Sequence, residues 1–372
     1  MSFSLSAEQR EVLEEALRLG RELAPRPAAE PGRLNRPLIR ALGEQGLLSR
    51  VFPEDGEVAA IDLCLLREGL AQGSTEAETA LALQGLGAYP ILQSGSGATR
   101  DRWIPAVRKG EAVAAFALTE PEHGSDAAAL ELAAAPDGDG WRLSGEKRWI
   151  SNAPDADVYT VFARTTPDAG AKGVTAFAVS GDAEGLSGES LDLLAPHAIG
   201  ALRFDGVRVG PEDVLGEVDG GFRVAMRTLD LFRPSVGAFA VGMAQAALDL
   251  AVAHAGERRS MGKLLREHQA VSQKLGEMAA RLEAARMLVY AAASAYDRGE
   301  RVTKIAAMAK LVATETAQWV VDEAVQIHGA VALERGHPLE HLYRDVRAPR
   351  IYEGTSEIQR EIIARELYRR EE

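Results

Sequence analysis

The chain has 372 residues, of which 46% are hydrophobic and 26% charged, as in a globular protein of two or three domains. Its net charge of −13 argues against nucleic acid or an anionic membrane as the main partner. We find no apolar run of the ~20 residues that a membrane span needs, and we expect no signal peptide at residues 1–4. The single cysteine, Cys64, excludes an internal disulfide and fits a cytoplasmic location.

The first segment, residues 1–114, is predicted to be an N-terminal α-helical domain. Apolar residues recur at helical spacing from Val12 to Leu23 and from Leu38 to Leu47, which is the pattern of amphipathic helices. Cys64 lies in a third apolar stretch of helical type, and a cysteine in such a place is by default a buried, inert thiol.

The second segment, residues 115–215, has the pattern of a β domain. Short β runs separated by Gly, Asp and Pro clusters are found at Ala112–Thr119, Trp141–Ile150, Val158–Arg164, Val174–Ser180 and Ala201–Val209. Their spacing favours an antiparallel β-barrel or sheet over β-α-β units, which need a helix between strands. No G-x-G-x-x-G motif follows a strand, which argues against a Rossmann domain.

The third segment, residues 216–372, is again helical and predicts a C-terminal four-helix bundle. The stretch Val236–Ala255 is rich in Ala and Gly and permits close helix packing. A later helix carries an apolar stripe with Ile305, Met308 and Val312 among its members. The order helical, β, helical predicts an α+β multidomain protein.

Near the C-terminus, the run Ile351–Gln359 places a carboxylate beside a glycine and two hydroxyl residues. Thr355 or Ser356 is well placed to cap the helix that follows. Glu353 then lies just before that helix. From this segment alone, Glu353 could be a solvated surface charge, and the helix N-terminus could also receive an anion such as phosphate.

Three ordered motifs resemble those of one family. The run Ala114–Asp126 resembles the first signature of the acyl-CoA dehydrogenase family, A-x-x-L-T-E-P-x-x-G-S-D. The second signature is matched by Gln326–Gly329, Tyr343–Asp345 and Ile351–Thr355, in that order. Between the signatures, Glu257–Lys263 with Glu267–Gln269 resembles the flavin-contacting stretch of the family. The resemblance covers nearly the whole chain.

The resemblance implies a homotetrameric FAD enzyme of fatty acid β-oxidation. Such an enzyme converts an acyl-CoA thioester to the trans-2-enoyl-CoA and passes electrons to an electron-transferring flavoprotein. By position, Glu353 is the base that removes the α-proton, its backbone N–H faces the thioester oxygen together with an FAD hydroxyl, and burial should raise the Glu353 pKa. Some members carry the base just before an Arg-Pro pair instead. Here Phe232 precedes Arg233-Pro234 and cannot accept a proton.

The same resemblance assigns the FAD contacts. In the β domain they are Phe116, Leu118, Thr119, Gly124, Ser125, Trp149, Ile150 and Ser151. In the C-terminal segment they are Arg258, Ser260, His268, Gln269, Gln326, Ile327, Gly329, Ala330, Gly354, Thr355, Ser356 and Glu357, several of them reaching the FAD of a neighbouring subunit. The substrate contacts are Ser125, Asp230, Arg233 and Tyr352, although Arg233 could equally form an internal ion pair with Asp230. No metal site is indicated.

Two other functions remain open from the sequence. A flavin-dependent acyl-thioester oxidase or an acyl-carrier-protein dehydrogenase could use the same fold. A flavin-free binding protein that has lost catalysis is also conceivable. The presence of Glu353, Thr119, Arg258 and Gln269 argues against this last possibility.

Overall fold

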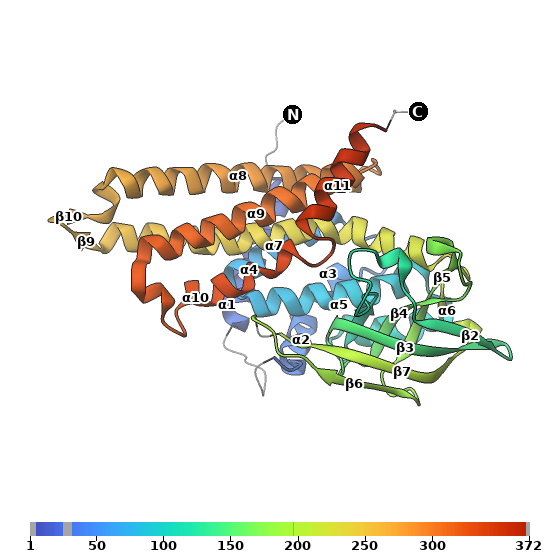
Figure 1. Cartoon of the computed structure of the whole chain (residues 1–372). Helices are drawn as coiled ribbons and strands as arrows, with labels where there is room; N and C mark the ends of the chain where they lie inside the picture. Colours follow the sequence, from blue (N-terminus) through green and yellow to red (C-terminus); the bar gives the residue numbers. More distant parts are fainter. Residues whose placement is uncertain (1–4, 25–31, 196, 370–372) are drawn as a thin grey trace. The chain divides into compact units, whose positions relative to one another are not determined.

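A computed structural model describes residues 5–24, 32–195 and 197–369 (Figure 1). The start of the chain at residues 1–4, where no signal peptide was expected, lies outside this range. Two compact units are formed: Met1–Ala24, Ala59–Glu78 and Asp230–Glu372 make up unit 1, and Pro25–Val58 with Thr79–Leu229 make up unit 2. The boundaries 1–114, 115–215 and 216–372 stay a prediction.

Unit 1 is helical. Its helices are α1 (Ala7–Leu23), α4 (Ala60–Gly73), most of α7 (Gly221–Glu257), α8 (Gln269–Asp297), α9 (Thr303–His328), α10 (Pro338–Asp345) and α11 (Ser356–Leu367). The long helices α7, α8 and α9 run side by side, and the short hairpin of β9 (Arg259–Ser260) and β10 (Lys263–Leu264) joins α7 to α8 (Figure 1). Cys64 is fully buried, as expected.

Particular residues account for helix ends and close helix contacts in unit 1. Ser6 caps α1 and forms a capping box with Gln9. The carboxylate of Asp297 accepts the backbone N–H groups of Ala60 and Ile61 at the start of α4. Within the Gly- and Ala-rich part of α7, a Cβ on Gly242 would lie 2.4 Å from the carbonyl oxygen of Glu68, so only glycine permits this approach.

The buried face of α9 differs from the predicted stripe. Val312 is 39% exposed, whereas Ala306, Ala313 and Ala317 are at most 1% exposed. Small side chains let helices pack closely, and periodicity weighted toward large apolar residues overlooks such a face. The helix prediction was right, but the assignment of Val312 to the core face was wrong.

Helix α7 is, among the described residues, long and apolar enough by length and composition to cross a membrane, and 67% of its most apolar window is buried. The sequence expectation of no such run was therefore too strict. Core helices pass the same test, so the finding is weak evidence for a span.

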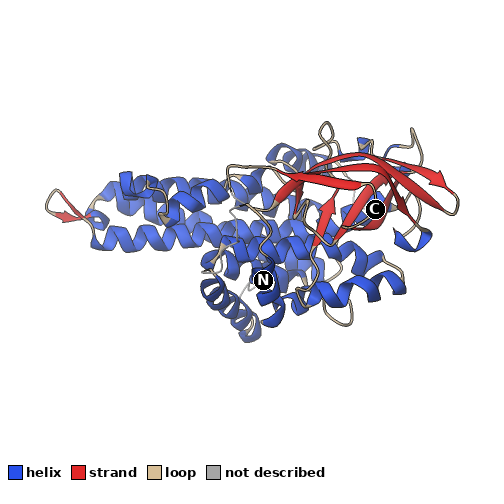
Figure 2. Ribbon diagram, turned by 90° about the horizontal axis from the view of Figure 1, so that it is seen from below, coloured by secondary structure: helices blue, strands red, loops and turns tan. Residues whose placement is uncertain are grey.

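Unit 2 combines helices with a mixed sheet (Figure 2). The helices are α2 (Arg36–Glu44), α3 (Leu47–Val51), most of α5 (Thr75–Ser94) and α6 (Gly97–Arg108). The strands are β1 (Ala114–Ala117), β2 (Ala133–Asp137), β3 (Gly140–Ser151), β4 (Val158–Arg164), β5 (Val174–Ser180), β6 (Leu186–Ser190), β7 (Ile199–Val209) and β8 (Val214–Leu215).

The sheet has the order β6-β7-β3-β2-β4-β5-β8, with β1 paired to β4. Most neighbours are antiparallel, as expected, but β1 runs parallel to β4 over Ala114–Ala117. A parallel pair needs a long crossover, which the intervening β2 and β3 provide. The helical N- and C-terminal parts and the central sheet confirm the predicted α+β class, with a mixed rather than purely antiparallel sheet.

Candidate active site

Glu353 sits on a turn between α10 and α11 with an unusual backbone. Its φ is +52° and that of Gly354 is +91°. A non-glycine residue in this left-handed region costs of order 1–3 kcal/mol and persists where the surroundings enforce it. Gly354 is required here for a second reason, because a Cβ would lie 2.6 Å from Nε2 of Gln359.

Two buried side chains hold this turn. The Lys310 ammonium on α9 donates to the carbonyl oxygen of Tyr352 (2.9 Å) and to that of Gly354. The Gln359 amide on α11 donates to the carbonyl oxygens of Glu353 (3.2 Å) and Gly354 (3.0 Å). Lys310 and Gln359 are both 0% exposed. All three carbonyls of residues 352–354 are therefore tied to the helices on either side.

The carboxylate of Glu353 is left available. The side chain is half-buried, and its Oε2 is buried without a hydrogen-bond partner in the described part of the chain. An unpaired buried carboxylate oxygen is costly and is therefore a position where a ligand group or a proton is expected. This arrangement removes the surface-charge interpretation of Glu353.

Three cations surround Glu353. Burial raises the pKa of Glu353, and the charges of Arg67, Lys310 and Arg233 offset part of this rise. A raised pKa makes a carboxylate a better proton acceptor, and the direction is the one expected from the sequence. The three cations in turn favour the ionised form of Glu353, which is the form that can accept a proton.

Two of these cations are already neutralised. Arg67 on α4 is 3% exposed; its Nε donates to Glu78 and its Nη1 to the Ser235 hydroxyl at 2.7 Å. Arg233 is paired with Asp230 at 3.2 Å. The internal ion pair considered for Arg233 is thus present. The roles of Asp230, Arg233 and Tyr352 in substrate binding stay predictions.

Two hydroxyl residues at the start of α11 have different partners. Thr355 is the N-cap, its Oγ1 accepting the Ile358 N–H at 3.3 Å. Ser356, the other candidate cap, instead donates to Glu315 on α9 at 2.6 Å. Glu357 is exposed in the first turn.

In unit 2, a buried ion pair supports the turn that follows β1. Lys147 Nζ on β3 donates to the Leu118 carbonyl (2.9 Å) and to Glu120 Oε1 (2.8 Å). The two Glu120 oxygens also accept the N–H groups of Glu131 and Leu132. Burial lowers the pKa of Lys147 to about 8, against the opposing effect of Glu120.

This support brings two predicted flavin segments together. Arg148 N donates to the Thr119 carbonyl at 3.0 Å, which places the end of β3 against the end of β1. Next to it, Trp149 is 45% exposed with φ +56°. Ile150 is buried, Ser151 half-buried, and Gly124 and Ser125 are exposed on the turn. Phe116 packs on Phe162 with ring centroids 4.9 Å apart.

In unit 1, the predicted dinucleotide contacts gather where α7 and α9 end. His254 on α7 stacks on His328 with centroids 4.2 Å apart, which brings the neighbourhood of Arg258 next to Gln326–Ala330. The His268 ring contacts the Ser260 carbonyl at 3.1 Å, closing the hairpin. Arg258, Ser260, Gln269, Gln326, Gly329 and Ala330 are exposed.

This exposed end of the bundle lies far from Glu353 within one chain. Gln326 follows Lys310 by sixteen positions on α9, or about 24 Å at the helical rise. The structure of one chain therefore does not gather the contacts near Gln326 and those of Gly354–Glu357 at one point.

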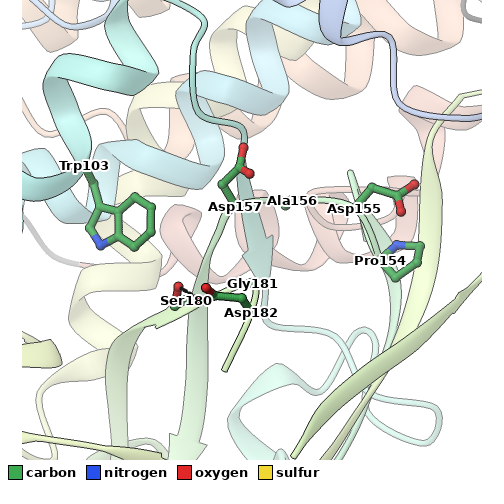
Figure 3. A pocket seen from close by; sticks show the side chains of 8 residues that line it. All are labelled: Trp103, Pro154, Asp155, Ala156, Asp157, Ser180, Gly181 and Asp182. Carbon is green, nitrogen blue, oxygen red and sulfur yellow. Dashed lines mark hydrogen bonds between the residues drawn. The ribbon is translucent and has the colours of Figure 1, made fainter. Parts of the chain in front are cut away.

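A separate surface pocket of about 440 Å³ lies in unit 2 (Figure 3). It is lined by Trp103, Pro154, Asp155, Ala156, Asp157, Ser180, Gly181 and Asp182. Asp157 is already paired with Arg36 at 2.7 Å, and Asp182 accepts from the Ser180 hydroxyl. No predicted site residue lines this pocket, and we do not assign it to the active site.

Sequence reasoning missed several residues of the site. Lys310, Gln359 and Arg67 come from three helices, and the structure shows that all three are buried. For Lys310 the sequence held a signal. This lysine lies on the same helix face as Ala306, Ala313 and Ala317, and a face of small side chains is typical of close, buried helix packing. Glu120 lies in the first signature and Lys147 in the predicted strand Trp141–Ile150, but nothing in the sequence showed that they pair.

Known family domains match the helical, β and helical segments of the chain in the same order. The chain matches the acyl-CoA dehydrogenase N-terminal domain at residues 6–111, the middle domain at 115–207 and the C-terminal domain at 219–368. The chain belongs to the acyl-CoA dehydrogenase family. The proposed alternative of a flavin-free binding protein loses its support here.

Individual relatives agree with this membership. The chain is 36% identical to cyclohexane-1-carbonyl-CoA dehydrogenase of Geobacter metallireducens, over 98% of each chain. It is 39% identical to the mitochondrial short-chain specific acyl-CoA dehydrogenase of Bos taurus, over 88% of this chain and 82% of the relative. The structure of butyryl-CoA dehydrogenase from Megasphaera elsdenii superposes with a TM-score of 0.93 at 34% identity, covering 99% and 100%.

As a member of this family, the protein is an FAD-dependent oxidoreductase that acts on acyl-CoA. Its residues fit that cofactor. Arg258 is an exposed guanidinium with no carboxylate paired to it among the described residues, as a diphosphate site requires. The indole of Trp149 is 45% exposed, follows the Arg148 N–H that binds the Thr119 carbonyl, and carries the Arg148 guanidinium 5.6 Å from its ring centroid; an aromatic ring exposed in this way suits stacking on a polar aromatic ring.

Proposed function

We propose that this acyl-CoA dehydrogenase acts on a CoA thioester whose acyl group is short and uncharged. It oxidises the α,β-bond of that acyl group to give the trans-2-enoyl-CoA, with Glu353 as the base. The observation that carries the proposal is the buried, unpartnered Oε2 of Glu353, whose pKa is raised by burial. The carboxylate takes the α-proton while electrons from that C–H bond move into the forming double bond. Bound FAD would supply the acceptor for the hydride that leaves the β-carbon.

The Glu353 backbone supports the same step. Negative charge develops on the thioester oxygen as the α-proton leaves, and preorganised N–H donors stabilise it. The Glu353 N–H has no acceptor in the described part of the chain, so it is available for this oxygen. The same residue would then supply both the base and one donor.

An uncharged acyl group is favoured by the pairing of the nearby cations. Arg67 is matched by Glu78, and Arg233 by Asp230. A carboxylate at the far end of the acyl chain would have to compete with these pairs. The names of the short-chain and cyclohexane-1-carbonyl relatives agree with an uncharged acyl group.

We further propose a homotetramer with an electron-transferring flavoprotein as acceptor, as the family resemblance implies. In one chain the contacts near Gln326 and Arg258 lie far from those at Gly354–Glu357. In the oligomer, the contacts near Gln326 and Arg258 would reach the FAD of a neighbouring copy. Light scattering of the FAD-loaded protein should give about four chain masses. A monomer that holds FAD stoichiometrically would contradict this arrangement.

The test is an anaerobic titration of the purified FAD-loaded protein with acyl-CoAs of different chain length and one dicarboxylic acyl-CoA. We expect the absorbance of the oxidised flavin to be lost with CoA thioesters of short, uncharged acyl groups. The dicarboxylic acyl-CoA should cause little loss of this absorbance. Admitting air to the reduced enzyme separates dehydrogenase from oxidase. Rapid peroxide formation would replace the dehydrogenase proposal with the oxidase alternative.

A further inference from the structure

Lys310 is a buried lysine whose charge is directed at peptide groups. Its side chain is 0% exposed, and a buried ammonium is tolerated only when it is hydrogen-bonded and compensated. Both recorded hydrogen bonds go to backbone carbonyls, those of Tyr352 and Gly354. The charged groups that act on it are Glu353, Arg233, Glu315 and Glu357.

The first of these carbonyls belongs to the peptide group that carries the Glu353 N–H. A peptide C=O and the N–H of the next residue are one conjugated unit. A cation hydrogen-bonded to the oxygen withdraws electron density and makes the N–H a stronger donor. The Lys310 bond to Tyr352 therefore acts on the amide that lacks an acceptor in the described residues.

Lys310 does not donate a hydrogen bond to the carboxylate of Glu353 in the described structure. Lys147 binds the carboxylate of Glu120 directly, whereas Lys310 donates to the backbone carbonyls of Tyr352 and Gly354. A direct ion pair would occupy the lone pairs that must take the proton. Acting through the backbone, Lys310 can strengthen the amide donor and fix the turn without blocking the base.

We propose that Lys310 is a positioning residue of the reaction, which polarises the 352–353 peptide so that the Glu353 N–H stabilises the negative charge that forms on the thioester oxygen. This inference rests on the proposed function. Its consequence is that the α-proton of the bound thioester becomes more acidic, and that the effect passes through one peptide bond.

The test uses the FAD-loaded Lys310→Gln variant, which keeps amide donors but removes the charge. Lys304→Gln is the matched control, since Lys304 is exposed on the same helix. The probe is crotonyl-CoA, isotope-labelled at the thioester carbonyl and bound to the oxidised enzyme. Infrared difference spectra report the polarisation of this carbonyl as a lowered stretching frequency.

We expect the wild type and Lys304→Gln to lower the stretching frequency of the thioester carbonyl by the same amount. In Lys310→Gln this lowering should be roughly half as large. The corresponding loss in kcat is about 10²-fold, the size seen when one oxyanion donor is removed, with KM changed less than about threefold. An unchanged frequency in FAD-loaded Lys310→Gln would overturn the proposal, and a purely structural role would lower FAD content and stability without this spectral change.

A second measurement needs no variant. Burial lowers the pKa of Lys310, so the wild-type ammonium loses its proton below the ordinary lysine range as pH rises. Between about pH 7 and about pH 10, the carbonyl frequency of bound crotonyl-CoA should move toward its value in water. A frequency that stays constant while Lys310 loses its proton, as followed by the NMR signal of its labelled side-chain nitrogen, contradicts the role of Lys310 even if Lys310→Gln does not fold.

These results separate two failures. If the wild-type protein neither lowers the carbonyl frequency nor is bleached by acyl-CoAs, the proposed function itself is wrong. If the wild type does both and Lys310→Gln matches it, only the role of Lys310 is wrong.

Discussion

Two glutamates, the buried Glu120 and the half-buried Glu353, each lie near a buried lysine but are hydrogen-bonded in opposite ways. In unit 2, Glu120 is hydrogen-bonded to Lys147 and to two backbone N–H groups. In unit 1, Glu353 keeps one oxygen without a partner, while Lys310 binds the carbonyls on either side of it. A saturated carboxylate stabilises a turn, and an unsaturated one can take a proton.

The largest effect is expected at Glu353. Replacing it with glutamine removes the proton acceptor and leaves the turn and its carbonyl contacts in place. We expect kcat to fall by about 10⁴-fold, the upper range for loss of a general base, with FAD content unchanged. Anaerobic flavin bleaching by acyl-CoA measures this, and Glu361→Gln on the exposed face of α11 is the control. Bleaching at the wild-type rate would remove Glu353 as the base.

Breaking the other pair should affect folding instead. Lys147→Met leaves the buried Glu120 charge without its cation, and removing one partner of a buried pair costs about 3–5 kcal/mol. Urea unfolding measures the loss, and Lys172→Met at an exposed position serves as the control. The comparison fails if the variant has wild-type stability, or if its FAD-loaded fraction loses the chemical step selectively.

The pH dependence of stability sharpens the contrast further. The pKa of Lys147 is lowered to about 8 in the folded protein, below its ordinary value in the unfolded chain. Between these two pKa values the unfolded chain binds more protons, so stability rises with pH, by up to about 1.4 kcal/mol per pH unit. The slope should be present in the wild type from about pH 8 upward and absent in Lys147→Met. Equal slopes for both proteins would show that Lys147 does not titrate there.

The smallest effect concerns the helix that follows the base. Thr355→Ala removes the side-chain oxygen that caps α11, which should cost about 1 kcal/mol of stability. Thr355→Ser keeps this oxygen and should retain most of the stability. Thermal unfolding distinguishes the two, and equal melting temperatures would mean that the cap contributes little.

Much of the fold could be predicted locally. Strands β4 and β5 have the predicted residues, because each is a continuous apolar run with turn residues at its ends. The strands β2, β6 and β8 were missed. β6 is mostly exposed and lacks an apolar run, and β8 has only two residues. The parallel pairing of β1 with β4 was not predictable either, because strand direction is set by the path of the intervening chain.

The candidate site divides in the same way. The run Ile351–Gln359 by itself predicted a capped helix with Glu353 and a glycine just before it, because such a cap depends on residues a few positions apart, but it left both Thr355 and Ser356 open as the cap. Only the tertiary structure decided that the carboxylate is half-buried, and that Lys310, Gln359 and Arg67 surround its turn. Lys310 on α9 and Arg67 on α4 are far from Glu353 in the chain, whereas Gln359 is near it in sequence and its amide turns back to the carbonyls of Glu353 and Gly354. Burial and charge compensation are properties of packing, so residue spacing along the chain does not contain them.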